Sequence, residues 1–260
     1  MRRIWRGYLL VSANAFGRLL TEKRTLALLL LAAMPVVFAF LQVTFNREVN
    51  LDTFILTNLF VILQMVVPLS ALVVGVAVMG DEIESRCVTY LFTRPLPRMA
   101  TYLGRLAGHA AAGGLLIPVS VLVVAVLIGR KVDLTGGEVA ASLGIALLGF
   151  LVYTTLFAAL RLVLRRALFV GFILAVIFEG WVSKLPVSGF ANVSVWHHLA
   201  VLHARLFGDR WVGQAVPRGI GLDETAAHSL WALAIIFVAS LAVGITLIQR
   251  REIRVPAAVA

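Results

Sequence analysis

Six long apolar runs dominate this sequence, and each is long enough to cross a lipid bilayer as a helix. They lie at about residues 26–45, 54–79, 106–128, 139–160, 167–183 and 229–249. A transmembrane helix needs about 20 residues to cross ~30 Å of hydrocarbon. Hydrophobic residues make up 61% of the chain and charged residues only 14%, whereas a soluble domain is about half apolar and a quarter charged. The sequence therefore predicts an all-α membrane protein with six transmembrane helices.

The basic residues predict how these helices are oriented. With the N-terminus in the cytoplasm, 16 of the 23 Lys and Arg residues fall in cytoplasmic segments and seven in outer ones. Short cytoplasmic loops are enriched in Lys and Arg. We therefore expect a multi-pass protein of the cell membrane (inner or plasma membrane) with both termini in the cytoplasm. This topology also accounts for the net charge of +10 without nucleic acid as a partner.

The segments outside the six runs have patterns of their own. Residues 1–25 carry apolar residues at helical spacing among arginines, which favours an N-terminal interfacial amphipathic helix over a leader that only anchors orientation. Residues 26–249 form the six-helix domain, and residues 250–260 form a cytoplasmic tail. The long segment 184–228 is expected to hold short helices on the outer side, at the membrane surface or dipping into it. Within it, Trp196, Leu199, Leu202 and Leu206 share one helical face.

Small residues open the third run. Gly104, Gly108 and Ala112 recur at a spacing of four, and such a ladder lets another helix approach closely. The pattern does not say which helix packs there.

The segment between the second and third runs reads DEIESRCVTYLFTRPLPRMATYLGR over residues 81–105. Ile83, Val88 and Leu91 would share one face of a short helix, which Pro95 and Pro97 would end. A short helix with an apolar edge and charged flanks is suited to contact a partner. A solvated loop whose prolines only make a turn is the alternative on pattern alone.

This segment resembles the loop between spans two and three of ABC-2 type permeases, the membrane subunits of ATP-driven transporters. The matches are Glu82, Ile83, Glu84, Tyr90, Leu91, Arg94, Pro95, Arg98 and Leu103-Gly104-Arg105. A second set of matches begins at the end of the fifth run, with Phe178-Glu179-Gly180, and continues after it with Leu185-Pro186 and Val193-Ser194-Val195. The chain departs from the family pattern at Ser85, Arg86, Cys87, Thr89 and Pro97.

The resemblance implies a function and a set of partners. The chain would be a permease subunit that forms a translocation path, with export as the expected direction. The loop would form a cytoplasmic coupling helix that docks on an ATPase subunit, present in two copies. A second permease copy or a paralogous permease would complete the dimer, membrane lipid would surround it, and an accessory protein could join on the outer side. The ATPase-coupling residues would be Asp81, Glu82, Ile83, Glu84, Tyr90, Leu91, Arg94, Pro95 and Arg98.

Nothing in the sequence predicts catalysis by the chain itself. It contains no Gly-x-x-x-x-Gly-Lys-Ser/Thr motif, so ATP and Mg²⁺ would be bound by the partner ATPase, and this chain would bind no cofactor. A membrane-embedded scaffold or membrane enzyme without an ATPase partner is the alternative function.

Two features could still mark a site. Glu179 is a carboxylate at the end of an apolar run, where a charge is costly, so it is a candidate for gating or for the substrate path. His197, His198 and His203 do not share a helical face and have no acid among them, so we expect no metal site. They are interpreted as polar residues of a surface helix.

Overall fold

The computed structural model describes residues 2–46, 48–84, 97–182, 189–207 and 224–250, which form helices with no strand among them. In chain order the helices are α1 (Arg2–Thr21), α2 (Arg24–Phe45), α3 (Leu51–Leu56), η1 (Thr57–Val66), α4 (Val67–Glu84), α6 (Arg98–Gly114), α7 (Leu116–Gly129), α8 (Gly136–Val163), α9 (Ala167–Ile173), η2 (Leu174–Phe178), α10 (Phe190–Val193), α11 (Val195–Phe207) and α12 (Ala226–Arg250). The segments η1 and η2 are π-helical. The all-α prediction is confirmed.

Five helical stretches are long and apolar enough to cross a membrane. They are Arg24–Phe45, Leu51–Gly80, Arg98–Gly129, Gly136–Val163 and Ala226–Arg250. They match the first, second, third, fourth and sixth runs of the sequence. The third stretch begins at Arg98, ahead of the expected start, and becomes buried from Thr101 onward. These five stretches are typical of a membrane protein.

The fifth run is shorter than expected. The apolar helix there covers Ala167–Phe178, about 18 Å at 1.5 Å per residue, which is less than the ~30 Å hydrocarbon core. Turns follow at Glu179 and Gly180, and the Trp181 amide still donates to the carbonyl oxygen of Ile177. The apolar helix therefore ends at Phe178, ahead of the expected end at 183. The layout of six crossings stays a prediction.

The second stretch is one continuous helix despite Pro68. In η1 the helix is wider, and the Val67 amide donates to the carbonyl oxygen of Ile62, five residues back. Proline has no amide hydrogen and its ring crowds the carbonyl four residues earlier. A π-helical turn before the proline accommodates this ring without ending the helix. The helix thus runs on through α4 to Glu84.

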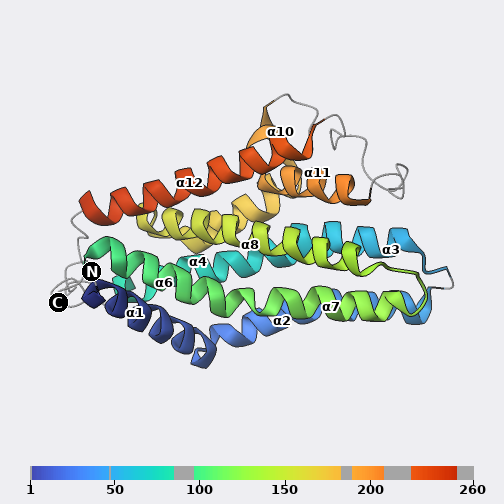
Figure 1. Cartoon of the computed structure of the whole chain (residues 1–260), viewed down its shortest axis with the longest axis horizontal. Coiled ribbons are helices and arrows are strands. Elements are labelled where there is room, and N and C mark those ends of the chain that lie inside the picture. The colour runs from blue at the N-terminus through green and yellow to red at the C-terminus, as the bar shows by residue number, and fades with distance from the viewer. Residues whose placement is uncertain (1, 47, 85–96, 183–188, 208–223, 251–260) are drawn as a thin grey trace.

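The centre of the molecule is the contact between α4 and α8. A β-carbon at Gly75 of α4 would lie 2.7 Å from the Thr154 carbonyl oxygen and 2.9 Å from Cβ of Phe157 in α8. Glycine is needed there because the two backbones touch. In Figure 1, α8 and α4 lie between α12 on one side and α6 and α7 on the other.

Helix α1 is the partner of the small-residue ladder in α6. A side chain at Gly108 would run into the carbonyl oxygen of Ser12, and one at Gly104 would lie 3.2 Å from the carbonyl oxygen of Tyr8. Ala15 of α1 is buried, whereas Leu10 on another face is exposed. The expected N-terminal helix is present, obliquely along α6 (Figure 1); its position in a membrane surface stays a prediction.

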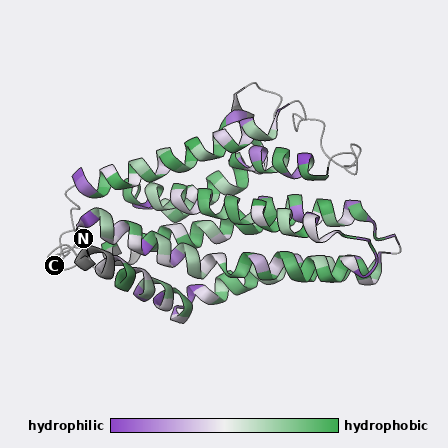
Figure 2. Cartoon of the chain, in the orientation of Figure 1, coloured by the Kyte–Doolittle hydropathy of each residue, from purple (hydrophilic) through white to green (hydrophobic). Residues whose placement is uncertain are grey.

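Different helix ends lie at the two ends of the bundle. The beginnings of α1 and α6 and the end of α12 lie at one end, and the α7–α8 turn and α3 lie at the other (Figure 1). Figure 2 shows hydrophobic residues along the middle of the long helices and hydrophilic residues at the beginning of α6 and the end of α12.

Candidate functional sites

The predicted coupling residues are divided between two helix ends and an undescribed segment. Asp81, Glu82, Ile83 and Glu84 form the last turn of α4, and Arg98 is the first residue of α6. Ile83 is half-buried and packs against a cluster that includes Tyr102 and Leu106. The remaining predicted residues, Tyr90, Leu91, Arg94 and Pro95, lie outside the described residues, as does the expected coupling helix itself.

Arg105 ties these two helix ends together. Its Nε donates a hydrogen bond of 2.6 Å to the carbonyl oxygen of Val78, one turn before the acidic end of α4. The side chain is 5% exposed, and a buried guanidinium–carbonyl bond is among the stronger hydrogen bonds. A β-carbon at Gly80 would lie 3.2 Å from Nε of Arg161 in α8. Arg105 of α6 therefore binds the end of α4, and Arg161 of α8 lies against it.

Glu179 lies in a buried polar centre. Its carboxylate accepts hydrogen bonds from the Ser194 hydroxyl, from the Val195 amide at 3.1 Å and from the Trp196 amide at 3.2 Å. Only 1% of the residue is exposed. The carboxylate thus binds the first amides of α11, where the free N–H groups and the helix dipole favour a negative charge.

Ser194 completes this N-terminal cap. Its hydroxyl oxygen also accepts a hydrogen bond of 3.1 Å from the His197 amide, which is the usual role of an N-cap serine. The first three amides of α11 are therefore all bound, two by Glu179 and one by Ser194. Glu179 and Ser194 belong to two separate stretches that resemble ABC-2 permeases, and the structure brings these two residues into direct contact.

The three histidines of α11 are buried, so the interpretation of a polar surface helix is wrong. His197 is 4% exposed, and His198 and His203 are fully covered, because α11 packs against α8, α12 and η1. His203 stands apart from the other two and packs its ring on Phe207, with ring centres 4.9 Å apart. Burial lowers the pKa of His203 to about 3, so this imidazole is neutral.

His197 and His198 face an acid that the sequence reasoning did not include. Nε2 of His197 lies 3.4 Å from Oε1 of Glu224, and Nδ1 of His198 lies 3.7 Å from Oε2. Glu224 comes much later in the chain and shortly precedes α12. No local spacing pattern joins residues so far apart, so this cluster could not be found without the fold.

A groove opens at the opposite end of the bundle from the beginning of α6. It has a volume of about 550 Å³ and lies between the last turns of α2 and the first turns of α3–η1. Its lining is Phe38, Gln42, Asn46, Glu48, Asn50, Asp52, Thr53, Leu56, Thr57, Phe60 and Val61.

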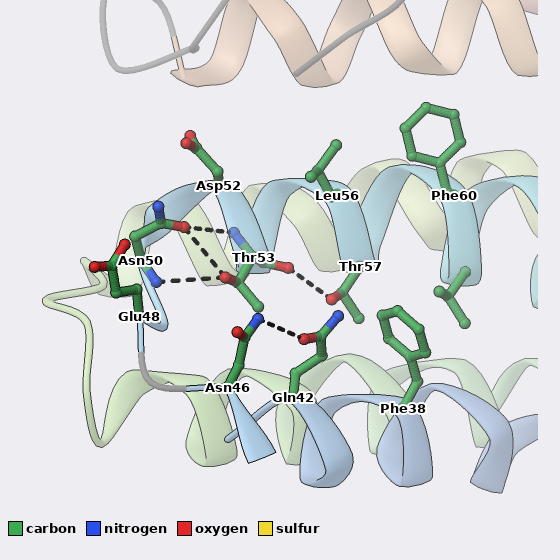
Figure 3. Close-up of a pocket in the computed structure, with 11 residues that line it drawn as sticks. Phe38, Gln42, Asn46, Glu48, Asn50, Asp52, Thr53, Leu56, Thr57 and Phe60 are labelled. Carbon is green, nitrogen blue, oxygen red and sulfur yellow. Dashed lines mark hydrogen bonds between the residues drawn. The ribbon is translucent and has the colours of Figure 1, made fainter. Parts of the chain in front are cut away.

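The polar groups of this groove are largely bound to one another. Figure 3 shows Asn46 donating to Gln42, Thr57 donating to the Thr53 carbonyl oxygen, and Asn50 and Thr53 joined by a reciprocal capping box. These bonds begin α3 and end α2. The groove is polar at its mouth and bears Phe38 and Phe60 at its other end, an amphipathic lining with no convergent catalytic groups.

Comparisons with known proteins do not assign the chain to a family. No protein-family model matches the sequence, and no curated protein matches it.

Proposed function

We propose that this chain is the permease subunit of an ATP-driven exporter, coupled to a separate ATPase through the segment between α4 and α6. One observation carries the proposal. Near the acidic last turn of α4, the Arg105–Val78 bond joins α4 to the second turn of α6, and the segment that resembles an ABC-2 coupling loop connects these two helices. The two helices that flank this segment are therefore bound to each other.

The helix that would carry the motion leads directly into the core. From Val67 to Glu84, α4 is uninterrupted, and its backbone touches α8 at Gly75. A force on the loop would therefore reach the middle of the bundle through one rigid element. ATP on the partner can shift the membrane part only if the loop binds the open and closed ATPase states with different affinity.

The proposal includes the membrane environment and the assembly. Both termini and the loop would lie in the cytoplasm, and two ATPase copies, which bind ATP and Mg²⁺, would act on a dimer of permeases. The exposed apolar side chains of α2 and α12, such as Leu30, Phe40, Trp231 and Ile235, would face lipid or the second permease. The amphipathic groove at the outer end supports an amphipathic rather than a strongly charged cargo.

Co-purification with an ATPase tests this proposal. The tagged chain is co-expressed with the ATP-binding-cassette subunits of its own genome, and the complex is purified in detergent. We expect a stable complex with the wild type, and none after Glu82, Glu84 and Arg94 are all replaced by alanine, because the docking charges are lost.

A matched control separates docking from a general effect of charge. Replacing Glu48, Asp133 and Arg130 by alanine also removes two acids and one base, but at the other end of the bundle. These three residues are exposed, and this variant should keep the complex. A complex that survives the first triple change would contradict docking through these three residues, whereas no complex with the wild type would favour the scaffold or membrane enzyme without an ATPase.

A further inference from the structure

We infer that His197, His198 and Glu224 form a zinc site that fastens α11 to the start of α12. Two imidazole nitrogens and a carboxylate are ligands that suit Zn²⁺. Their ligand atoms all lie within 4.8 Å of one another. This inference does not depend on the proposed transport function.

The separations fit a tetrahedral ion. Zn²⁺ binds nitrogen and oxygen ligands at about 2.0–2.2 Å, which places neighbouring ligand atoms of a tetrahedron about 3.3–3.5 Å apart. The Glu224 oxygens lie 3.4 Å from Nε2 of His197 and 3.7 Å from Nδ1 of His198. Small side-chain rotations therefore suffice to bring all three ligands onto one ion.

The tautomer of His198 leaves a lone pair aimed at the acid. Its Nε2 lies 3.0 Å from the Asn192 carbonyl oxygen, and because a carbonyl only accepts, Nε2 must carry the proton. Nδ1 is then unprotonated in the neutral ring. A carbonyl that fixes the ligating tautomer in this way is the usual outer partner of a metal-bound histidine.

Nδ1 of His198 and Oε2 of Glu224, which both carry an unshared electron pair, therefore face each other in the protein interior. Nδ1 of His198 points to Oε2 of Glu224, and the Ser229 hydroxyl oxygen lies 3.4 Å from Nδ1, at the long limit of a hydrogen bond. A metal cation between these two atoms would bind both lone pairs.

Two further atoms of the cluster lack a hydrogen bond. Nε2 of His197 and Oε2 of Glu224 are both buried, and neither has a hydrogen-bond partner within the described parts of the chain. Buried polar atoms are nearly always bound, so atoms without partners that converge on one point indicate a missing ligand. One ion would bind both.

The position of Glu224 is set by the same helix that carries the histidines. Arg205 of α11 donates to the Glu224 carbonyl oxygen through Nε at 3.1 Å and Nη2 at 2.8 Å. Thr225 then accepts from the His228 amide at 3.2 Å and begins α12. The acid is therefore held in place before any ion binds, as a metal site requires.

Metal analysis of the purified chain tests the site. The full chain is purified in detergent with a histidine-free tag, stripped with a chelator and re-equilibrated with Zn²⁺. We expect about one zinc per chain in the wild type and at least a tenfold weaker binding in Glu224→Gln, which keeps the shape of the side chain but loses its charge. Glu48→Gln, an exposed carboxylate elsewhere, should bind zinc like the wild type.

A second readout separates metal binding from folding. Zn²⁺ should raise the thermal unfolding midpoint of the wild type and of Glu48→Gln, but not that of Glu224→Gln, because only a folded site binds the ion. Co²⁺ in the wild type should show the visible absorption of a four-coordinate site. Equal zinc binding by the wild type and Glu224→Gln, or no zinc in the wild type, would overturn the inference.

Discussion

The Glu179 carboxylate joins two segments that are separate in sequence. It follows the short helix of the fifth run and binds the first amides of α11 through Val195 and Trp196. A carboxylate at this place satisfies donors that would otherwise be buried without partners. The role of Glu179 in gating or in the substrate path stays a prediction. Its structural role is to cap the N-terminus of α11.

We expect Glu179→Gln to destabilise the protein. The glutamine amide nitrogen donates, so one of the donors around it would lose its acceptor, which costs about 1–3 kcal/mol for a buried group. The thermal unfolding midpoint in detergent should fall, and the Val195 and Trp196 amides should exchange hydrogen faster. Glu48→Gln, an exposed carboxylate, serves as the control. Unchanged exchange at these two amides would contradict the role as a cap.

The sequence pointed to Glu179 because a carboxylate beside an apolar run is unusual. It did not point to the bond with Ser194, fifteen residues further on, because that contact depends on the turn after Phe178. Glu224 was missed for the same reason, since it meets His197 only when α11 and α12 are packed. A single unusual residue can be identified from its neighbours in the sequence, whereas a site formed by residues far apart in the sequence can be identified only from the folded structure.

At the scale of elements, the closest helix contacts are made by glycines. Gly108 lets the α6 backbone meet the Ser12 carbonyl of α1, whereas a β-carbon added at Gly17 of α1 would have no neighbouring atom within 4 Å. The two glycines therefore differ in what a methyl group would do. One position is filled by the partner helix and the other is open.

Gly108→Ala should loosen α1, and Gly17→Ala should not. A methyl group at Gly108 forces the backbones apart, and overpacking of this kind costs about 1–3 kcal/mol. At Gly17 alanine should stabilise the helix by about 0.5–1 kcal/mol, because glycine is a poor helix former. Limited trypsin cleavage next to Lys23, between α1 and α2, measures both. Equal cleavage of the two variants would contradict the close contact.

The element boundaries show what an apolar pattern can and cannot predict. The long runs predicted five of the helices because hydrophobicity over about 20 residues depends on no partner. The early start of α6 at Arg98 was missed because the first turns of this helix are polar enough to look like a loop, although α6 packs against α1. The ladder at Gly104 and Gly108 predicted a close partner, but only the fold identified it.

At the scale of the whole molecule, burial separates the inner helices from the outer ones. The stretch Leu51–Gly80 is mostly buried inside the protein, whereas α2 and α12 leave most of their apolar side chains uncovered. A soluble protein would not leave so much apolar surface in contact with water. Lipid or a second copy of this chain would cover α2 and α12, in keeping with a chain that lies in a membrane.

The orientation of this bundle in the membrane can be tested at Cys87. It is the chain's single cysteine and belongs to the segment proposed to contact the ATPase, so a membrane-impermeant maleimide should label it only after the cells are opened. In a chain that also carries Cys87→Ser, Asp133→Cys moves the thiol to the exposed turn between α7 and α8, at the opposite end of the bundle. That variant should react in intact cells, because an odd number of crossings separates the two ends. Labelling of Cys87 from outside intact cells would place the loop on the wrong side for any cytoplasmic ATPase, and the proposed coupling would fail with it.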